Sequence, residues 1–98
     1  MRLVDKVKIA FNDYKVNIVD GPVIYDDKIC YGNIEFAKGN INISNLYSED
    51  WQKCTLIHEC LHGINEEVEA ELTEDQIRTM AKGLYCFIKD NPNMFKED

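Results

Sequence analysis

The 98-residue sequence contains no apolar run that approaches the roughly 20 residues of a membrane span. Its first residues, MRLVDKVKIAF, include neither the apolar stretch nor the cleavage site of a secretory signal. Basic residues are also few, because 11 lysines and arginines stand against 18 acidic residues, for a net charge of −7. This balance does not favour a nucleic-acid-binding surface. We therefore expect a cytoplasmic protein that binds neither membranes nor nucleic acids.

Closely spaced cysteines are absent as well. None of the four cysteines forms a C-x-x-C pair, so the sequence does not predict a structural zinc site built on cysteine. Because no secretory signal is predicted, we expect free thiols rather than disulfides. The four residues are Cys30, Cys54, Cys60 and Cys86.

Histidine occurs only twice, and both copies belong to the pentapeptide HECLH at residues 58–62. On a helix, residues four apart lie on the same face, so His58 and His62 can bind one tetrahedral metal at about 2.0–2.1 Å each. Glu59 then lies beside the open position of the metal, where it can take a proton from bound water. The motif predicts a Zn²⁺ site with two histidine ligands and Glu59 as general base.

Alternating apolar and polar residues predict antiparallel strands within residues 1–47. The first hairpin is expected from strands at 6–11 and 14–19 around a turn at Asn12-Asp13. On one face these strands place Val7, Ile9, Phe11, Tyr14, Val16 and Ile18. A second hairpin is expected around Lys38-Gly39, with Ile34, Phe36, Ile41 and Ile43 alternating in its arms. Residues 23–31 are harder to assign, although Ile29 and Tyr31 can extend the first arm of this second hairpin.

The C-terminal half has helical periodicity. A helix over residues 48–65 is predicted from the cap Ser48 and from an apolar stripe at Ile57, Leu61, Ile64 and Val68. An acidic connection over residues 65–72 follows. A second helix over 73–91 is predicted from a Thr73–Gln76 capping box and from a stripe at Ile77, Met80/Ala81, Leu84 and Ile88. Residues 92–98 are expected to fray. The prediction is one α+β domain, with a small antiparallel sheet of three to four strands followed by two helices.

A catalytic zinc usually has three protein ligands, and the sequence has no third histidine. Cys54 and Glu66 lie one turn from a histidine on the same face. A row from 54 to 62, or from 58 to 66, rises about 12 Å, too far for ligand atoms that lie about 3–4 Å apart. The stripe of the second helix extends back to Glu74, and a carboxylate there needs a partner. We predict Glu74 as the third ligand, with Asp75 and Glu71 as alternatives.

The sequence also bears on the tyrosines and on the strand that would bind a substrate. Tyr85 lies about 16 Å along the helix from Glu74 and is expected in the core. Four other tyrosines are candidate donors to a transition state: Tyr14, Tyr25, Tyr31 and Tyr47. The strand at Ile41–Ser44 is the expected edge against which a substrate peptide would lie extended.

The sequence resembles a known family over roughly residues 7–92. The resemblance includes the Tyr31-Gly32-x-Ile34 stretch and the Ile41-Asn42-Ile43 strand, which look like the strands before the active helix in that family, and it is carried mainly by two segments. These are HECLHGI, and, after a short acidic connection, LTEDQIRTMAKGLYCFIKDNP, in which Glu74 and Ala81 fit an E-x-x-x-x-x-x-A pattern. Both are similar to the small phage and prophage zinc metallopeptidases related to the ImmA/IrrE group. The resemblance implies a minimal gluzincin, with a short sheet, an HExxH helix and a Glu-bearing helix. The additional helices and DNA-binding domain of fuller ImmA-like proteins have no counterpart in this sequence.

The function predicted from these observations is zinc-dependent hydrolysis of a peptide or protein substrate. Two alternatives remain: a non-catalytic, zinc-stabilised interaction domain of phage origin, and a structural module that needs no metal. A measurement of metal content distinguishes the metal-free module from the peptidase and from the zinc-stabilised interaction domain. Peptidase activity with and without Glu59 then separates an enzyme from a binding domain.

Overall fold

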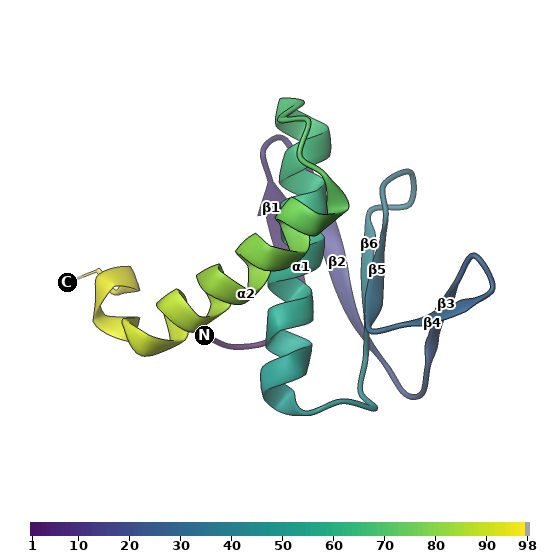
Figure 1. The fold of residues 1–98 in the computed structure, drawn as a ribbon, viewed down its shortest axis with the longest axis horizontal. Helices are drawn as coiled ribbons and strands as arrows, with labels where there is room; N and C mark the ends of the chain where they lie inside the picture. Colours follow the sequence, from purple (N-terminus) through teal and green to yellow (C-terminus); the bar gives the residue numbers. More distant parts are fainter. Residues whose placement is uncertain (98) are drawn as a thin grey trace.

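The computed structural model describes residues 1–97 and has the predicted α+β architecture (Figure 1). Six strands come first: β1 (Lys6–Ile9), β2 (Asn12–Val19), β3 (Val23–Tyr25), β4 (Lys28–Cys30), β5 (Gly32–Glu35) and β6 (Asn40–Ser44). Three helices follow: α1 (Glu49–Val68), α2 (Glu74–Asp90) and the short 3-10 helix η1 (Pro92–Phe95). The division between a strand-rich half and a helical half agrees with the sequence pattern.

The main sheet has the strand order β1-β2-β6-β5 and is mixed. The pairs β1–β2 and β5–β6 are antiparallel hairpins, whereas β2 and β6 run parallel, with Val16 opposite Ile41. The prediction of a wholly antiparallel sheet was therefore wrong. The two hairpins lie side by side through their second arms, and these arms point in the same direction. Alternation along a strand predicts a hairpin, but it does not determine which arms meet.

The first hairpin turns two residues earlier than predicted. Ala10 and Phe11 form the turn, with Ala10 at φ 52°, and Asn12 already pairs with Ile9. Phe11 is 92% exposed, so its predicted place on the core face is wrong. The observed register places Val7 opposite Tyr14 and allows Ile9 and Tyr14 to be buried together. Burial of this face overrides the turn preference of Asn12-Asp13.

Residues 23–30 form a separate two-stranded hairpin, β3–β4, which projects away from the main sheet (Figure 1). Its turn residues Asp26 and Asp27 both have positive φ, at 53° and 60°, as a type I′ turn requires. Ile29 lies in β4, so it does not extend the second hairpin. Tyr31 does extend it, because its carbonyl oxygen accepts a hydrogen bond at 2.9 Å from the Ser44 N–H, next to the Gly32–Ile43 pair.

Helix α1 packs on the main sheet, and Leu56 joins Ile9, Tyr14, Val16, Ile41 and Ile43 in the core. Ser48 caps the helix by accepting a hydrogen bond from the Trp51 N–H, as predicted. The helix continues to Val68 instead of ending near residue 65. Gly63, inside the helix, allows the helix to approach the sheet closely, because a Cβ there would lie 2.6 Å from Ile9 Cδ1.

The predicted core stripe of α1 does not face the core. Ile57 and Leu61 are half-buried, whereas Ile64 and Val68 are 42% and 58% exposed. The buried residues of the helix are instead Cys54, Thr55, Leu56, Glu59 and Gly63. Because α1 contacts both the sheet and α2, its buried surface is not one simple stripe. The spacing of apolar residues alone therefore predicted the wrong buried face of α1.

Helix α2 crosses α1, and its C-terminal end continues past α1 into η1 (Figure 1). The predicted Thr73–Gln76 capping box is present, and the helix ends before Asn91-Pro92 as predicted. Ile77, Ala81 and Tyr85 form its buried side, whereas Met80 and Leu84 of the predicted stripe are exposed and Ile88 is half-buried. Residues 92–95 form η1 where fraying was expected, and residue 98 lies outside the described part. No helix within residues 1–97 is long and apolar enough to cross a membrane.

Tyr85 lies in the core, as predicted, and donates a hydrogen bond to Asp50 in the first turn of α1. Burial, together with this bond, raises the pKa of Tyr85 to about 12. The bond from Tyr85, and then the charge of Lys89, lower the pKa of Asp50. One hydrogen bond thus ties the middle of α2 to the start of α1.

Tyr85→Phe should lower the melting temperature near pH 7 by roughly 4–8 °C, the effect of one lost hydrogen bond in a domain of this size. A raised tyrosine pKa stabilises the fold fully below its unfolded value of 10.0, and this contribution is lost as pH rises towards about 12. The lowered pKa of Asp50 stabilises above its unfolded value of 3.8, and this contribution is lost at lower pH. Thermal unfolding of parent and variant at pH 3, 7 and 11 tests this. An equal difference at all three would contradict it.

Candidate metal centre

His58 and His62 lie on one face of α1, one turn apart, and their Nε2 atoms are 3.2 Å from each other. The four-residue spacing of the motif produces this arrangement, because four residues of a helix make slightly more than one turn. Both side chains are largely covered, with 22% and 27% of their surface exposed. Two imidazole nitrogens therefore point at a common position at the surface of the helix.

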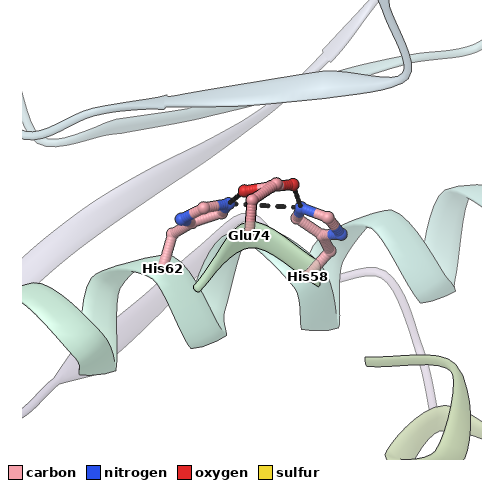
Figure 2. A group of neighbouring side chains, drawn as sticks. All are labelled: His58, His62 and Glu74. Atoms are coloured by element: carbon pink, nitrogen blue, oxygen red, sulfur yellow. Dashed lines mark hydrogen bonds and ion pairs between the residues drawn. The ribbon is translucent and has the colours of Figure 1, made fainter. Parts of the chain in front are cut away.

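Glu74, the first residue of α2, brings its carboxylate to the same position. Its Oε1 lies 3.1 Å from His58 Nε2 and its Oε2 lies 2.8 Å from His62 Nε2. Figure 2 shows the carboxylate between the two imidazole rings. Thr73, the residue before Glu74, caps α2 through the capping box and thereby holds Glu74 in the first turn of the helix.

The donor set fits a zinc ion. The ligand atoms of His58, His62 and Glu74 all lie within 4.8 Å of one another. Tetrahedral zinc with ligands at about 2.0–2.2 Å separates neighbouring ligand atoms by about 3.4 Å. The observed nitrogen–nitrogen and nitrogen–oxygen distances of 2.8–3.2 Å are close to that value. Two imidazoles and one carboxylate are also a ligand set that catalytic zinc uses, with one position left for water.

The alternative ligands lie elsewhere. Asp75 is 87% exposed at its side chain and binds Arg78 at 2.6 Å. Glu71 is exposed in the connection between the helices, where its φ is 58°. Glu66 is exposed one turn beyond His62, and Cys54 is buried. Among residues 1–97, only the His58–His62–Glu74 group brings three such donors together. All four cysteines are free, as expected.

The electrostatics of the site favour a neutral imidazole at His58. Burial lowers the pKa of His58 and outweighs the opposing effect of the Glu74 carboxylate. A neutral imidazole is the form that binds a metal, since the protonated ring has no free lone pair. The lowered pKa of His58 therefore favours binding of a cation by this imidazole.

Glu59 is buried, with 7% of its surface exposed, and its side chain lines the cavity beside the histidines. Burial raises the pKa of Glu59 to about 8, and the charge of Glu74 adds to the effect. Glu59 does not belong to the three-donor group. A carboxyl group that is close to the ligands but not one of them, and that holds a proton readily, has the properties of a general base and acid.

A cavity of about 650 Å³ opens over this group and lies between α1, α2 and β5. Its walls are mainly apolar and aromatic, with charged side chains at the helices. It is lined by Tyr25, Cys30, Tyr31, Gly32, Asn33, Ile34, Phe36, Trp51, Cys54, Thr55, His58, Glu59, His62, Glu74, Arg78 and Lys82. The volume is in the range of ordinary ligand sites and accommodates several residues of a peptide.

Two of the four tyrosines predicted as candidate donors line the cavity. Tyr25 and Tyr31 line it, whereas Tyr14 is 3% exposed in the core beneath α1. Tyr47 packs edge-on against Tyr31, with 4.5 Å between the ring centroids, and does not line the cavity. Tyr25 and Tyr31 therefore remain as donors that can reach a bound molecule.

The strand beside the cavity is β5, not the predicted β6. β6 pairs on both sides, with β2 and with β5, so it has no free edge. β5 is the edge strand, and its residues Gly32, Asn33 and Ile34 line the cavity. Gly32 is required here, because a Cβ would lie 2.5 Å from the Asn42 carbonyl oxygen.

The two basic residues that line the cavity, Arg78 and Lys82, were not singled out from the sequence. Both follow Glu74 at four-residue intervals on α2, so they share its face. The four-residue spacing can be read from the sequence, but it does not indicate that this face of α2 lines a cavity.

Comparisons of the chain with family models, with curated protein sequences and with solved structures found no match.

Proposed function

We propose that this chain is a zinc-dependent peptidase. The observation that carries the proposal is the convergence of His58, His62 and Glu74 from two helices at the floor of a cavity, with the non-ligand Glu59 beside them. A purely structural zinc site is closed by four protein ligands, whereas a catalytic site keeps one position open. Three donors facing a cavity correspond to the second arrangement.

Each side chain has a distinct role in this proposal. His58, His62 and Glu74 would hold Zn²⁺, which supplies a Lewis acid for attack of water on a peptide carbonyl. Glu59 takes the proton from the attacking water and delivers it to the leaving amine. Tyr25 or Tyr31, which both line the cavity, would donate a hydrogen bond to the developing oxyanion.

The substrate would bind as an extended peptide along β5. An edge strand offers unpaired backbone N–H and C=O groups, and peptides commonly add to a sheet by pairing with them. β5 is such an edge and borders the cavity directly. Backbone pairing would bring the scissile peptide bond to the candidate metal position whatever the side chains are.

The resemblance of the HECLH segment and the Glu74–Ala81 segment to small ImmA/IrrE-related phage and prophage metallopeptidases supports the same proposal. We also propose that the chain works in the cytoplasm, because four free thiols suit a reducing compartment. We propose a protein or peptide partner rather than a nucleic acid, in agreement with the net charge of −7.

Elemental analysis and a peptidase assay test the proposal together. We expect about one zinc per chain, and we expect hydrolysis of a mixed peptide library that chelation abolishes and added zinc restores. Zinc without hydrolysis would instead indicate a zinc-stabilised interaction domain. A chain without zinc affinity would exclude both.

Removal of zinc should also destabilise the fold, because the ion would join the start of α2 to α1. A ligand that binds only the native state at about 100 times its dissociation constant adds about 2.7 kcal/mol to the free energy of unfolding. In a domain of this size, that corresponds to a fall in melting temperature of roughly 10–20 °C on chelation. Thermal unfolding with and without chelator checks it. An unchanged melting temperature after verified zinc removal would contradict a zinc that links the helices.

A further inference from the structure

The α2 wall of the cavity carries two cations, Arg78 and Lys82, beyond the candidate metal ligand Glu74. The three residues recur every four positions on one helix, so Arg78 and Lys82 lie about 6 and 12 Å from Glu74 along the helix axis. The wall thus presents one carboxylate and then two positive charges in a row. This row runs away from the proposed site of peptide cleavage.

The two cations face a cavity that has few acids of its own. Its only lining carboxylates are Glu59 and Glu74, among residues 1–97, and both have roles at the proposed zinc site. Arg78 binds Asp75 through one nitrogen, and Asp75 does not line the cavity. A guanidinium has five N–H donors, so Arg78 retains donors for a second anion. Lys82 makes no ion pair within the described residues.

Lys82 is held at the wall by an aromatic cluster. Its Nζ lies 5.7 Å from the centroid of the Trp51 ring, a cation–π distance. Trp51 in turn packs edge-on against Tyr31, with 5.1 Å between the ring centroids. Trp51 and Tyr31 also line the cavity, so the ammonium group lies at the border of an apolar recess. Attraction between such a cation and an anion is stronger there than in open solvent.

We propose that Arg78 and Lys82 bind a carboxylate of the substrate and make this site selective for an acidic peptide. The inference rests on the proposed peptidase function. An extended peptide advances about 3.3 Å per residue, so the 6–12 Å between Glu74 and this pair corresponds to a carboxylate about two to four residues from the scissile bond. Arginine and lysine bind carboxylates through charge-assisted hydrogen bonds. The carboxylate belongs either to an Asp or Glu side chain or to the C-terminus of the peptide.

Three mixtures of N-acetylated octapeptides, free of Lys, Trp and Tyr, distinguish these sources. The first has one Glu among neutral residues and an amidated C-terminus, the second has Gln in place of Glu, and the third has Gln and a free C-terminus. We expect the zinc-loaded chain to cleave the first or the third mixture with a kcat/KM at least about tenfold above the second. The favoured mixture identifies the source of the carboxylate.

Arg78→Gln and Lys82→Gln should each reduce this preference, and the double variant should abolish it. Lys89→Gln is the matched control, because Lys89 lies on the same helix but does not line the cavity. It should retain the preference. Equal cleavage of the three mixtures by the parent, or a preference that survives in the double variant, would overturn the proposal.

Binding is measured separately, so that this inference and the peptidase function fail independently. Trp51 is the only tryptophan, and its fluorescence reports on the recess beside Lys82. A tighter apparent Kd for the first or third mixture without any cleavage would support the carboxylate site and refute the peptidase. Equal affinity for all three mixtures would overturn the carboxylate site.

Discussion

Glu74→Ala is expected to weaken zinc binding by more than about 100-fold, while Glu66→Ala, Glu71→Ala and Asp75→Ala bind zinc within about threefold of the parent. Even loss of a residue that only orients a ligand costs about 10–100-fold in metal affinity. Loss of a direct ligand should cost more. Among residues 1–97, only the Glu74 carboxylate pairs with both histidine nitrogens, at 3.1 Å from His58 Nε2 and 2.8 Å from His62 Nε2.

The three control positions match Glu74 in charge, so their substitution separates coordination from a general loss of negative charge. Asp75 is the closest match, because it also lies in the first turn of α2 and also favours the helix dipole. Zinc titration against a competing chelator measures all four variants. If Asp75→Ala or Glu71→Ala lost zinc and Glu74→Ala retained it, the start of α2 would be oriented differently from the structure.

Glu59→Gln is expected to retain zinc and to lose hydrolysis by about 10²–10⁴-fold, the usual contribution of a general base or acid. Glutamine has nearly the shape of glutamate but cannot accept the proton of the attacking water. Zinc affinity should change little, because Glu59 is outside the three-donor group. Parallel measurement of zinc content and of kcat/KM separates the two effects.

Cys60→Ser is a suitable control for Glu59→Gln, since Cys60 also lies within the motif and is half-buried, but it does not line the cavity. It should retain both zinc and activity. Loss of zinc from Glu59→Gln would show that Glu59 is a ligand. Full activity in that variant would remove Glu59 from the mechanism.

The candidate site was accessible from the sequence because its geometry is mostly local. The spacing of His58 and His62 requires only that residues 58–62 be helical, and the Ser48 cap and helical periodicity indicated that they were. The position of Glu74 followed from its phase with Ile77 and Ala81, which are both 1% exposed. The assigned phase was partly wrong, because Tyr85, not Leu84, continues the buried side. Ile77 and Ala81 lie nearest to Glu74, so the error did not affect it.

The pairing of the strands, and the edge strand along which a substrate would bind, could not be predicted from the sequence in this way. The sequence favoured β6 as the edge by chain order, whereas the structure buries β6 between β2 and β5. The residues Ile41 and Ile43 are fully buried there, as central strand residues commonly are. An alternating pattern gives the same signal for a central and an edge strand when one face of the sheet is covered.

The sequence by itself determined the helical segments, the α+β class, the four-residue spacing of the histidines and the cap that places Glu74 first in α2. These depend on hydrogen bonds and side-chain preferences within a few residues of the chain. The tertiary structure alone decided that α2 crosses α1 at the histidines, that β5 is the free edge, and that Arg78 and Lys82 line the cavity. These depend on which apolar surfaces pack together across the fold, because many pairings bury similar area and only their joint packing selects one.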